Sequence, residues 1–127
     1  MKILAIIGSR NFDRYEYFER YMLFFYPNVD FIITGDARGT NSLAIRYAEK
    51  HGVPYRSIRA EWNKFGGGAG HIRSKDILDP AKKILAWWDN KSPGTRWEIK
   101  YAKEIHKVPE IVFWPVCQIG CKSKSYF

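Results

Sequence analysis

Strand-like runs alternate with amphipathic helical segments along this chain. Five short runs are predicted to be strands: 2–7, 29–34, 55–60, 83–88 and 110–114. Four segments between them place apolar residues at helical spacing: 13–26, 40–51, 71–78 and 94–106. Strands that alternate with helices predict a parallel sheet with right-handed crossovers. We therefore expect a Rossmann-like three-layer α/β/α fold with a five-stranded, mainly parallel sheet.

The chain length of 127 residues is sufficient for one domain, which we expect over 1–114, with 115–127 as a C-terminal tail. The first apolar run is too short for a signal peptide, and no run has the length needed to cross a bilayer. Cys117 and Cys121 give no disulfide framework, and they lack the further ligands of a zinc site. These features predict a cytoplasmic protein that does not enter membranes.

The balance of charge points to anionic partners. The formal net charge is +8, which suits nucleotides, nucleic acid or anionic surfaces. Aromatic residues make up 17% of the chain and could stack on bases, but in a small domain they more often fill the core. Charge and aromatic content therefore leave both a small nucleotide and a polymer open.

Three glycine-containing loops each follow the carboxyl end of a predicted strand, and so should share one edge of the sheet. Their candidate binding residues are Gly8, Ser9, Arg10, Gly35, Asp36, Arg38, Gly39, Thr40, Asp89, Gly94 and Thr95. Glycine allows close backbone approach to a ligand, helix N-termini favour phosphate, and arginine can bind it bidentately. Ordinary strand-to-helix turns also need such residues. Because three such loops occur at one edge, we favour a binding site over ordinary turns. The sequence contains neither a Walker A loop nor a G-x-G-x-x-G motif, which weakens interpretation of the chain as an ATPase or a dehydrogenase.

Five motifs occur in order: Gly8-Ser9-Arg10, Asp36-Ala37-Arg38-Gly39 followed by Leu43-Ala44, Ala60-Glu61-Trp62, Gly66 with Ala69, Gly70 and Arg73, and Gly94-Thr95. In this order they resemble the SLOG superfamily, which includes the Lonely-guy cytokinin phosphoribohydrolases, the DNA-processing protein DprA and small stand-alone proteins. The stand-alone members are the most similar, although many carry glycine at Asp36 and asparagine at Ser74. The resemblance implies a Rossmann-like fold and a nucleotide-derived ligand, and it adds Gly70 and Arg73 to the candidate binding residues.

Arg73 and Glu98 resemble the catalytic pair of the phosphoribohydrolases. In those enzymes an arginine opens an R-K motif, and a glutamate ends P-G-G-x-G-T-x-x-E. This chain keeps G-T-x-x-E at 94–98 but lacks the preceding glycine pair, and Ser74 stands in place of the lysine. The resemblance implies that Glu98 could act on charge developing at C1′ and that Arg73 could hold phosphate.

Each of these single residues also has a structural interpretation. Thr95 and Glu98 have the spacing of a capping box, which we rank ahead of catalysis. Asp36 and Asp89 are expected to cap turns rather than bind ribose or a metal. His71 could be a general base, but we expect it to be structural or simply exposed.

The tryptophans could form a stacking surface or fill the core. Because side chains alternate along a strand, Trp87 and Trp88 should face opposite sides of the sheet. Trp88 is a candidate for the binding edge, whereas Trp87 and Trp97 are expected in the core. Trp62, in the A-x-W motif, is a further candidate for base stacking.

We expect a protein that senses or sequesters a nucleotide or nucleotide-derived small molecule, such as an ADP-ribose-like or cyclic-nucleotide signal. The first alternative is a nucleoside-phosphate N-glycosidase that uses Arg73 and Glu98. The second is a DprA-like binder of single-stranded nucleic acid. No cofactor and no metal are implied, and formation of a homo-oligomer remains open.

Overall fold

The computed structural model describes residues 1–61, 63 and 66–113. Over these residues the fold is the predicted Rossmann-like α/β arrangement, with five parallel strands in one sheet. The strands are β1 (Ile3–Gly8), β2 (Phe31–Gly35), β3 (Tyr55–Ile58), β4 (Lys83–Trp88) and β5 (Glu110–Phe113), in the spatial order β3-β2-β1-β4-β5. The predicted tail and Trp62 lie outside the described residues.

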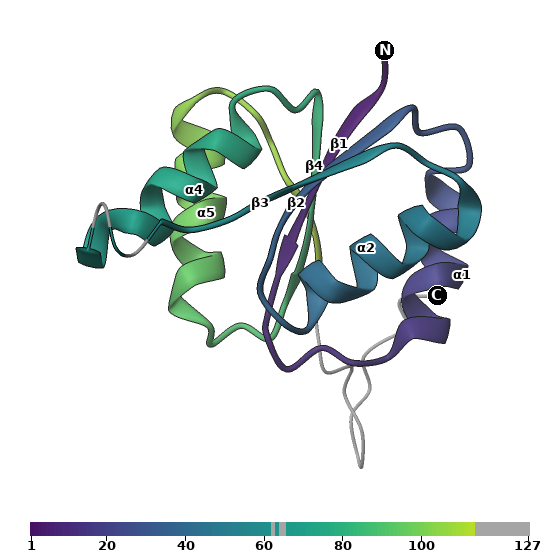
Figure 1. Cartoon of the computed structure of the whole chain (residues 1–127), viewed down its shortest axis with the longest axis horizontal. Helices are drawn as coiled ribbons and strands as arrows, with labels where there is room; N and C mark the ends of the chain where they lie inside the picture. Colours follow the sequence, from purple (N-terminus) through teal and green to yellow (C-terminus); the bar gives the residue numbers. More distant parts are fainter. Residues whose placement is uncertain (62, 64–65, 114–127) are drawn as a thin grey trace.

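Helices cover both faces of the sheet and complete three layers (Figure 1). On one face lie α1 (Tyr15–Phe25) and α2 (Thr40–His51); on the other lie α4 (Ala69–Leu78) and α5 (Pro93–Glu104). The short 3-10 helix η1 (Gly66–Gly68) leads into α4. None of the helices in the described residues is long and apolar enough to cross a membrane.

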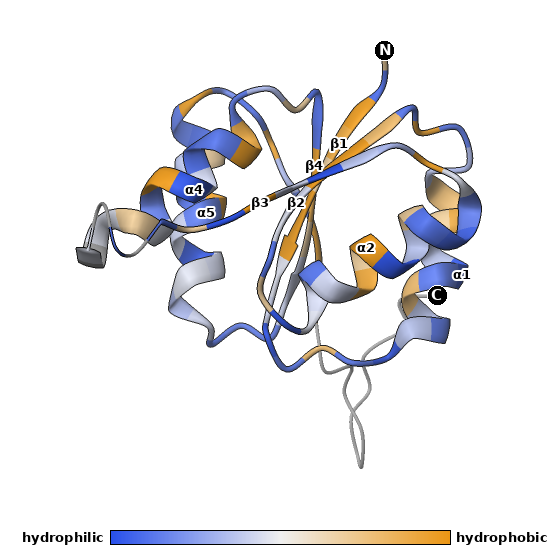
Figure 2. Cartoon of the chain, viewed as in Figure 1, coloured by the Kyte–Doolittle hydropathy of each residue, from blue (hydrophilic) through white to orange (hydrophobic). Residues whose placement is uncertain are grey.

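The continuous apolar runs of the central strands are explained by two separate cores. Leu4 and Ile6 of β1 point toward α1 and α2, whereas Ala5 and Ile7 point toward α4 and α5. Both sets are buried, because parallel strands between helical layers have no face in water. Figure 2 shows the same pattern, with apolar strands at the centre and hydrophilic residues along the outer sides of the helices.

The core beneath α1 and α2 is aromatic. Trp87 is 1% exposed and stacks on Phe12, with ring centroids 4.6 Å apart and planes at 13°. Phe18 and Tyr21 pack around the same indole at 5.5 and 5.1 Å. Trp87 therefore lies in the core as predicted, and Trp88 packs on the opposite side of the sheet.

The order in which successive strands are added to the sheet reverses between β1 and β4. From β1 it moves outward through β2 and β3, then returns to add β4 and β5 on the other side. The loops after β1 and β4 therefore diverge toward opposite faces. In sheets of this kind, the crevice at the carboxyl ends of these two strands is where ligands bind.

Candidate functional site

A cavity of about 570 Å³ opens at this switch point. That volume falls within the range of roughly 300–1,000 Å³ that is usual for small-molecule sites. The loops after β1, β2 and β4 line it together with the first turns of α4 and α5. Of the predicted site residues, the structure brings these together at its wall: Gly8, Ser9, Arg10, Arg38, Gly70, Arg73, Asp89, Gly94, Thr95 and Glu98.

Ser9 joins the three loops. Its backbone N–H donates to the carbonyl oxygen of Trp87 at 2.8 Å, and its own carbonyl accepts from the Thr40 hydroxyl at 2.9 Å. Its hydroxyl oxygen accepts from the backbone N–H of Asp89 at 3.0 Å. A side chain 1% exposed thus fixes the β1, β2 and β4 loops relative to one another. One buried residue therefore connects all three loops of the cavity wall.

The glycines of the first two loops allow those loops to pack closely on neighbouring backbone. A Cβ at Gly39 would lie 2.3 Å from the carbonyl oxygen of Arg10, and Gly39 has a φ of +77°. A Cβ at Gly8 would lie 2.4 Å from the carbonyl oxygen of Trp87. Gly39 does not line the cavity, so its close approach is to the neighbouring loop and not to a ligand.

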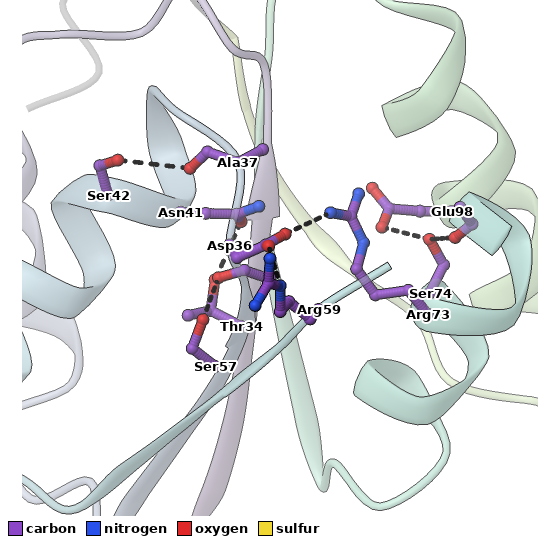
Figure 3. A network of polar contacts seen from close by, with 12 residues as sticks. Thr34, Asp36, Ala37, Asn41, Ser42, Ser57, Arg59, Arg73, Ser74 and Glu98 are labelled. Atoms are coloured by element: carbon purple, nitrogen blue, oxygen red, sulfur yellow. Dashed lines mark hydrogen bonds and ion pairs between the residues drawn. The ribbon is translucent and has the colours of Figure 1, made fainter. Parts of the chain in front are cut away.

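Arg73 crosses the crevice from α4 to the β2 loop (Figure 3). Its Nη1 donates to Asp36 Oδ1 at 3.1 Å, and Arg59 Nε lies 3.9 Å from the other oxygen of Asp36. The Arg73 side chain is 14% exposed, so it is mostly buried where it crosses the crevice. The expected turn-capping role of Asp36 is wrong, because its carboxylate pairs with these two arginines.

Gly35 leaves the space that the Arg73 guanidinium occupies. A Cβ at Gly35 would lie 3.4 Å from Arg73 Cζ and 2.7 Å from Asn41 Nδ2. Asn41 is itself fixed by a hydrogen bond of 2.9 Å between its Oδ1 and the Thr34 hydroxyl. The end of β2 is thus shaped to seat an arginine and an amide at the cavity wall.

Glu98 points into the protein from α5 and is 8% exposed. Its Oε2 accepts a hydrogen bond of 2.7 Å from the Ser74 hydroxyl of α4. Burial raises the pKa of the Glu98 carboxyl, although Ser74 and the Arg73 guanidinium act in the opposite direction. The predicted capping box is wrong, because α5 begins at Pro93 after Ser92, and Thr95 already lies inside the first turn.

The start of α5 faces the cavity with free backbone donors. Among the described residues, no group accepts a hydrogen bond from the backbone N–H of Gly94 or Thr95, and both residues line the cavity. The turn before the helix is held by Asp89, whose Oδ1 accepts from the N–H groups of Lys91 and Ser92 at 2.9 and 2.7 Å. Asp89 therefore caps a turn, as expected.

These hydrogen bonds also determine the charge of Asp89. Burial raises the pKa of its carboxyl, but the hydrogen bonds from Ser92, Lys91 and Ser9 outweigh that effect, so the net pKa is lowered. Asp89 is therefore a carboxylate near neutral pH, and its negative charge is turned toward the backbone of its own loop.

Five predicted residues do not line this cavity: Gly35, Asp36, Gly39, Thr40 and Trp88. Asp36 instead borders an adjoining hollow that shares the arginines of the main cavity, Arg10, Arg38 and Arg73. Trp88 lies behind the β4 loop, where its indole N–H donates to the Ser92 carbonyl at 3.1 Å and its ring faces Arg96. It supports the loop and does not reach the cavity.

Sequence reasoning missed several lining residues, among them Asn11, Ala37, Asn41, Ser92 and Pro93. Asn11, Ala37 and Asn41 directly follow predicted residues, and Ser92 and Pro93 lie between Asp89 and Gly94 in the third loop, so the loop positions were the available signal. Trp97 was predicted in the core and is instead half-buried, with its ring stacked 4.1 Å from that of His71.

A second hollow, of about 380 Å³, lies at the opposite, amino-terminal edge of the sheet. Its wall is mostly apolar and includes Phe25, Val29 and Ile3. Within the described residues, none of the four main helices begins at that edge. Within the described part of the chain, no three His, Cys, Asp or Glu side chains cluster as metal ligands would.

Comparisons of the chain with protein-family models, with curated proteins and with solved structures found no match.

Proposed function

We propose that this protein binds a nucleotide or nucleotide-derived small molecule in the cavity at the carboxyl ends of β1 and β4, as a sensor or a sequestering protein. The observation that carries the proposal is the excess of positive groups at this wall. Arg10, Arg38 and Arg73 all line it. Free N–H groups at the start of α5 add to them.

Asp36 pairs with Arg73, but the acidic residues of the wall do not cancel the charge of Arg10 and Arg38. Asp89 directs its carboxylate to the backbone of its own turn, and burial favours the neutral form of Glu98. In the described residues, neither Arg10 nor Arg38 has an ion-pair partner within 4.0 Å. A phosphate group would supply the missing partner in a bidentate geometry that suits arginine. The motif resemblance to the SLOG superfamily independently favours a nucleotide-derived ligand.

The test is calorimetry with nucleoside monophosphates, cyclic nucleotides, ADP-ribose and oligonucleotides. Arg38→Ala should weaken binding of the preferred small ligand by about tenfold, the scale of one lost charged hydrogen bond. Arg20→Ala removes the same charge from an exposed position on α1 and should leave affinity unchanged. Equal losses in both variants would mean that net charge, not this cavity, attracts the ligand.

A second candidate function is hydrolysis of the N-glycosidic bond of a nucleoside phosphate. It is favoured by the placement of Glu98, which faces the cavity beside Arg73 and not the N-terminus of its own helix. In such a reaction the bond between C1′ and the base breaks, water adds at C1′, and the base departs with a proton. A carboxyl of raised pKa suits proton donation to the departing base.

Chromatography of free base separates the two functions. Release of base from AMP, from other nucleoside monophosphates or from NAD, lost in Glu98→Gln while binding persists, would establish the hydrolase. Binding without release of base in the wild type would leave the sensing or sequestering function.

A further inference from the structure

A column of three parallel aromatic rings stands on α4 and α5 beside the cavity. The imidazole of His71 lies 4.1 Å from the ring of Trp97 with 5° between the planes, and Trp97 lies 5.4 Å from Tyr101 with 2° between them. Lys75 Nζ lies 5.7 Å from the Tyr101 ring centroid. Stacking in this geometry fixes the orientation of the exposed His71 ring.

His71 is the aromatic side chain that this column presents to the cavity. Among the described residues, it is the single aromatic residue of the cavity wall, and Trp97 is not part of that wall. Trp97 covers one face of the imidazole, and among the described residues no aromatic ring stacks on the opposite face. No hydrogen bond to the imidazole occurs within the described part of the chain, so stacking is what holds the ring.

The cavity offers His71 as a stacking surface for a base and separate polar groups for a phosphate. Gly94 and Thr95, with their free N–H groups, line the same cavity, as do the three arginines. Those groups suit a phosphate, but they offer a planar base no apolar surface. Nucleobases in proteins are held largely by stacking on aromatic rings, because every base has a π-face.

We propose that His71 is the base-stacking platform of this site, with the nucleobase against the imidazole face opposite Trp97 and the phosphate at the start of α5. The inference rests on the proposed function and deepens it. It predicts that the site prefers ligands with an aromatic base over sugar phosphates. A sugar phosphate would pair with the arginines but would leave the imidazole face of His71 uncovered.

The test compares AMP with ribose 5-phosphate by calorimetry on the full chain. In the wild type, AMP should bind more tightly. His71→Ala should weaken AMP by about tenfold, within the range of base–aromatic stacking, and leave ribose 5-phosphate unchanged. His71→Phe keeps a planar ring and should retain AMP affinity to within about threefold. Because His71 is exposed, neither substitution should alter the thermal unfolding transition.

The outcomes are distinguishable. If the wild type binds AMP and His71→Ala binds it equally well, the platform is refuted while the proposed function stands. Equal losses for AMP and ribose 5-phosphate would assign His71 to the phosphate and also refute the platform. If the wild type binds no nucleoside monophosphate, no cyclic nucleotide and no ADP-ribose, the proposed function and this inference are both wrong.

Discussion

Ser74 Oγ lies 2.7 Å from Glu98 Oε2 and 3.0 Å from the carbonyl oxygen of Gly70. A hydroxyl group carries one hydrogen, so Ser74 cannot donate to both oxygens. The hydroxyl therefore donates to one oxygen at a time, and its shorter contact is the one to Glu98 Oε2. Burial raises the pKa of Glu98, and donation from Ser74 acts in the opposite direction. Ser74 of α4 thus contacts Glu98 of α5 at the cavity wall and influences the pKa of its carboxyl.

Glu98→Gln should make stability less dependent on pH. Because the pKa of Glu98 is raised on folding, its contribution is fully present below the unfolded value of about 4.5 and is lost as pH rises through the folded value. Glutamine carries no such proton. In urea unfolding at pH 5 and pH 8, the stability of Glu98→Gln relative to wild type should increase with pH. An equal difference in unfolding free energy between Glu98→Gln and wild type at both pH values would show that ionisation of Glu98 does not destabilise the folded protein.

Alanine substitution should destabilise the fold at Gly39 but not at Gly94. Gly39→Ala should destabilise by about 1–3 kcal/mol, because a positive φ and the Arg10 backbone both oppose a Cβ. Gly94→Ala is the matched control: outside its own helix and chain neighbours, no atom in the described part of the chain lies within 4 Å of its Cβ position, so stability should stay within about 0.5 kcal/mol. Chemical denaturation of both variants measures the difference. Similar stability of the two would mean that the β1 and β2 loops are not packed as described.

Phe12→Ala should destabilise the fold by about 3–5 kcal/mol, the usual cost of removing a buried phenylalanine. Phe12 is fully buried against Trp87, two residues beyond Arg10 of the cavity wall. Loss of this anchor should also free the loop and weaken ligand binding. Phe12→Leu keeps most of the volume and should cost less than half as much. Differential scanning calorimetry would check this, and a loss below about 1 kcal/mol in Phe12→Ala would contradict the packing.

Acid should weaken the contact between α1 and α2. Hydrogen bonds from Lys50 and His51 lower the pKa of Glu19 to about 2, although burial acts in the opposite direction. A lowered folded pKa stabilises above the unfolded value of about 4.5, and this contribution is lost as pH falls toward about 2. Glu19→Gln should cost about 1 kcal/mol at pH 7 and almost nothing at pH 2, because much of the side-chain network faces solvent. An equal cost at both pH values would show that charge is not what Glu19 contributes.

The strands and the edge of the sheet that carries the cavity were predictable because they depend on local pattern and on parallel topology. Ile3–Gly8 and Lys83–Trp88 are buried on both faces, so their continuous apolar runs indicated central strands. The β3 edge strand is partly exposed, and its weaker pattern gave a strand too long at its end. The loops at the cavity followed from these assignments, since carboxyl ends of parallel strands share an edge.

What could not be predicted depends on how α4 and α5 pack against the sheet and each other. The Glu98 capping role was expected from the Thr95-x-x-Glu98 spacing, but Pro93 starts the helix earlier and turns Glu98 toward Ser74. Likewise, the Arg73–Asp36 pair joins residues 37 positions apart across the crevice. Such contacts are set by tertiary packing, for which a single sequence carries no periodic signal.

Calorimetric titration of nucleotides into wild type and Gly94→Val tests the central claim most directly. Apart from its own helix and chain neighbours, no atom of the described residues lies within 4 Å of a Cβ at Gly94, and Gly94 lines the cavity, so we expect valine to obstruct the site without crowding the core. We predict one nucleotide bound per wild-type chain, affinity reduced by about tenfold or more in Gly94→Val, and an unchanged unfolding midpoint. A folded Gly94→Val protein that binds the same nucleotide with wild-type affinity would contradict the assignment of this cavity as the binding site.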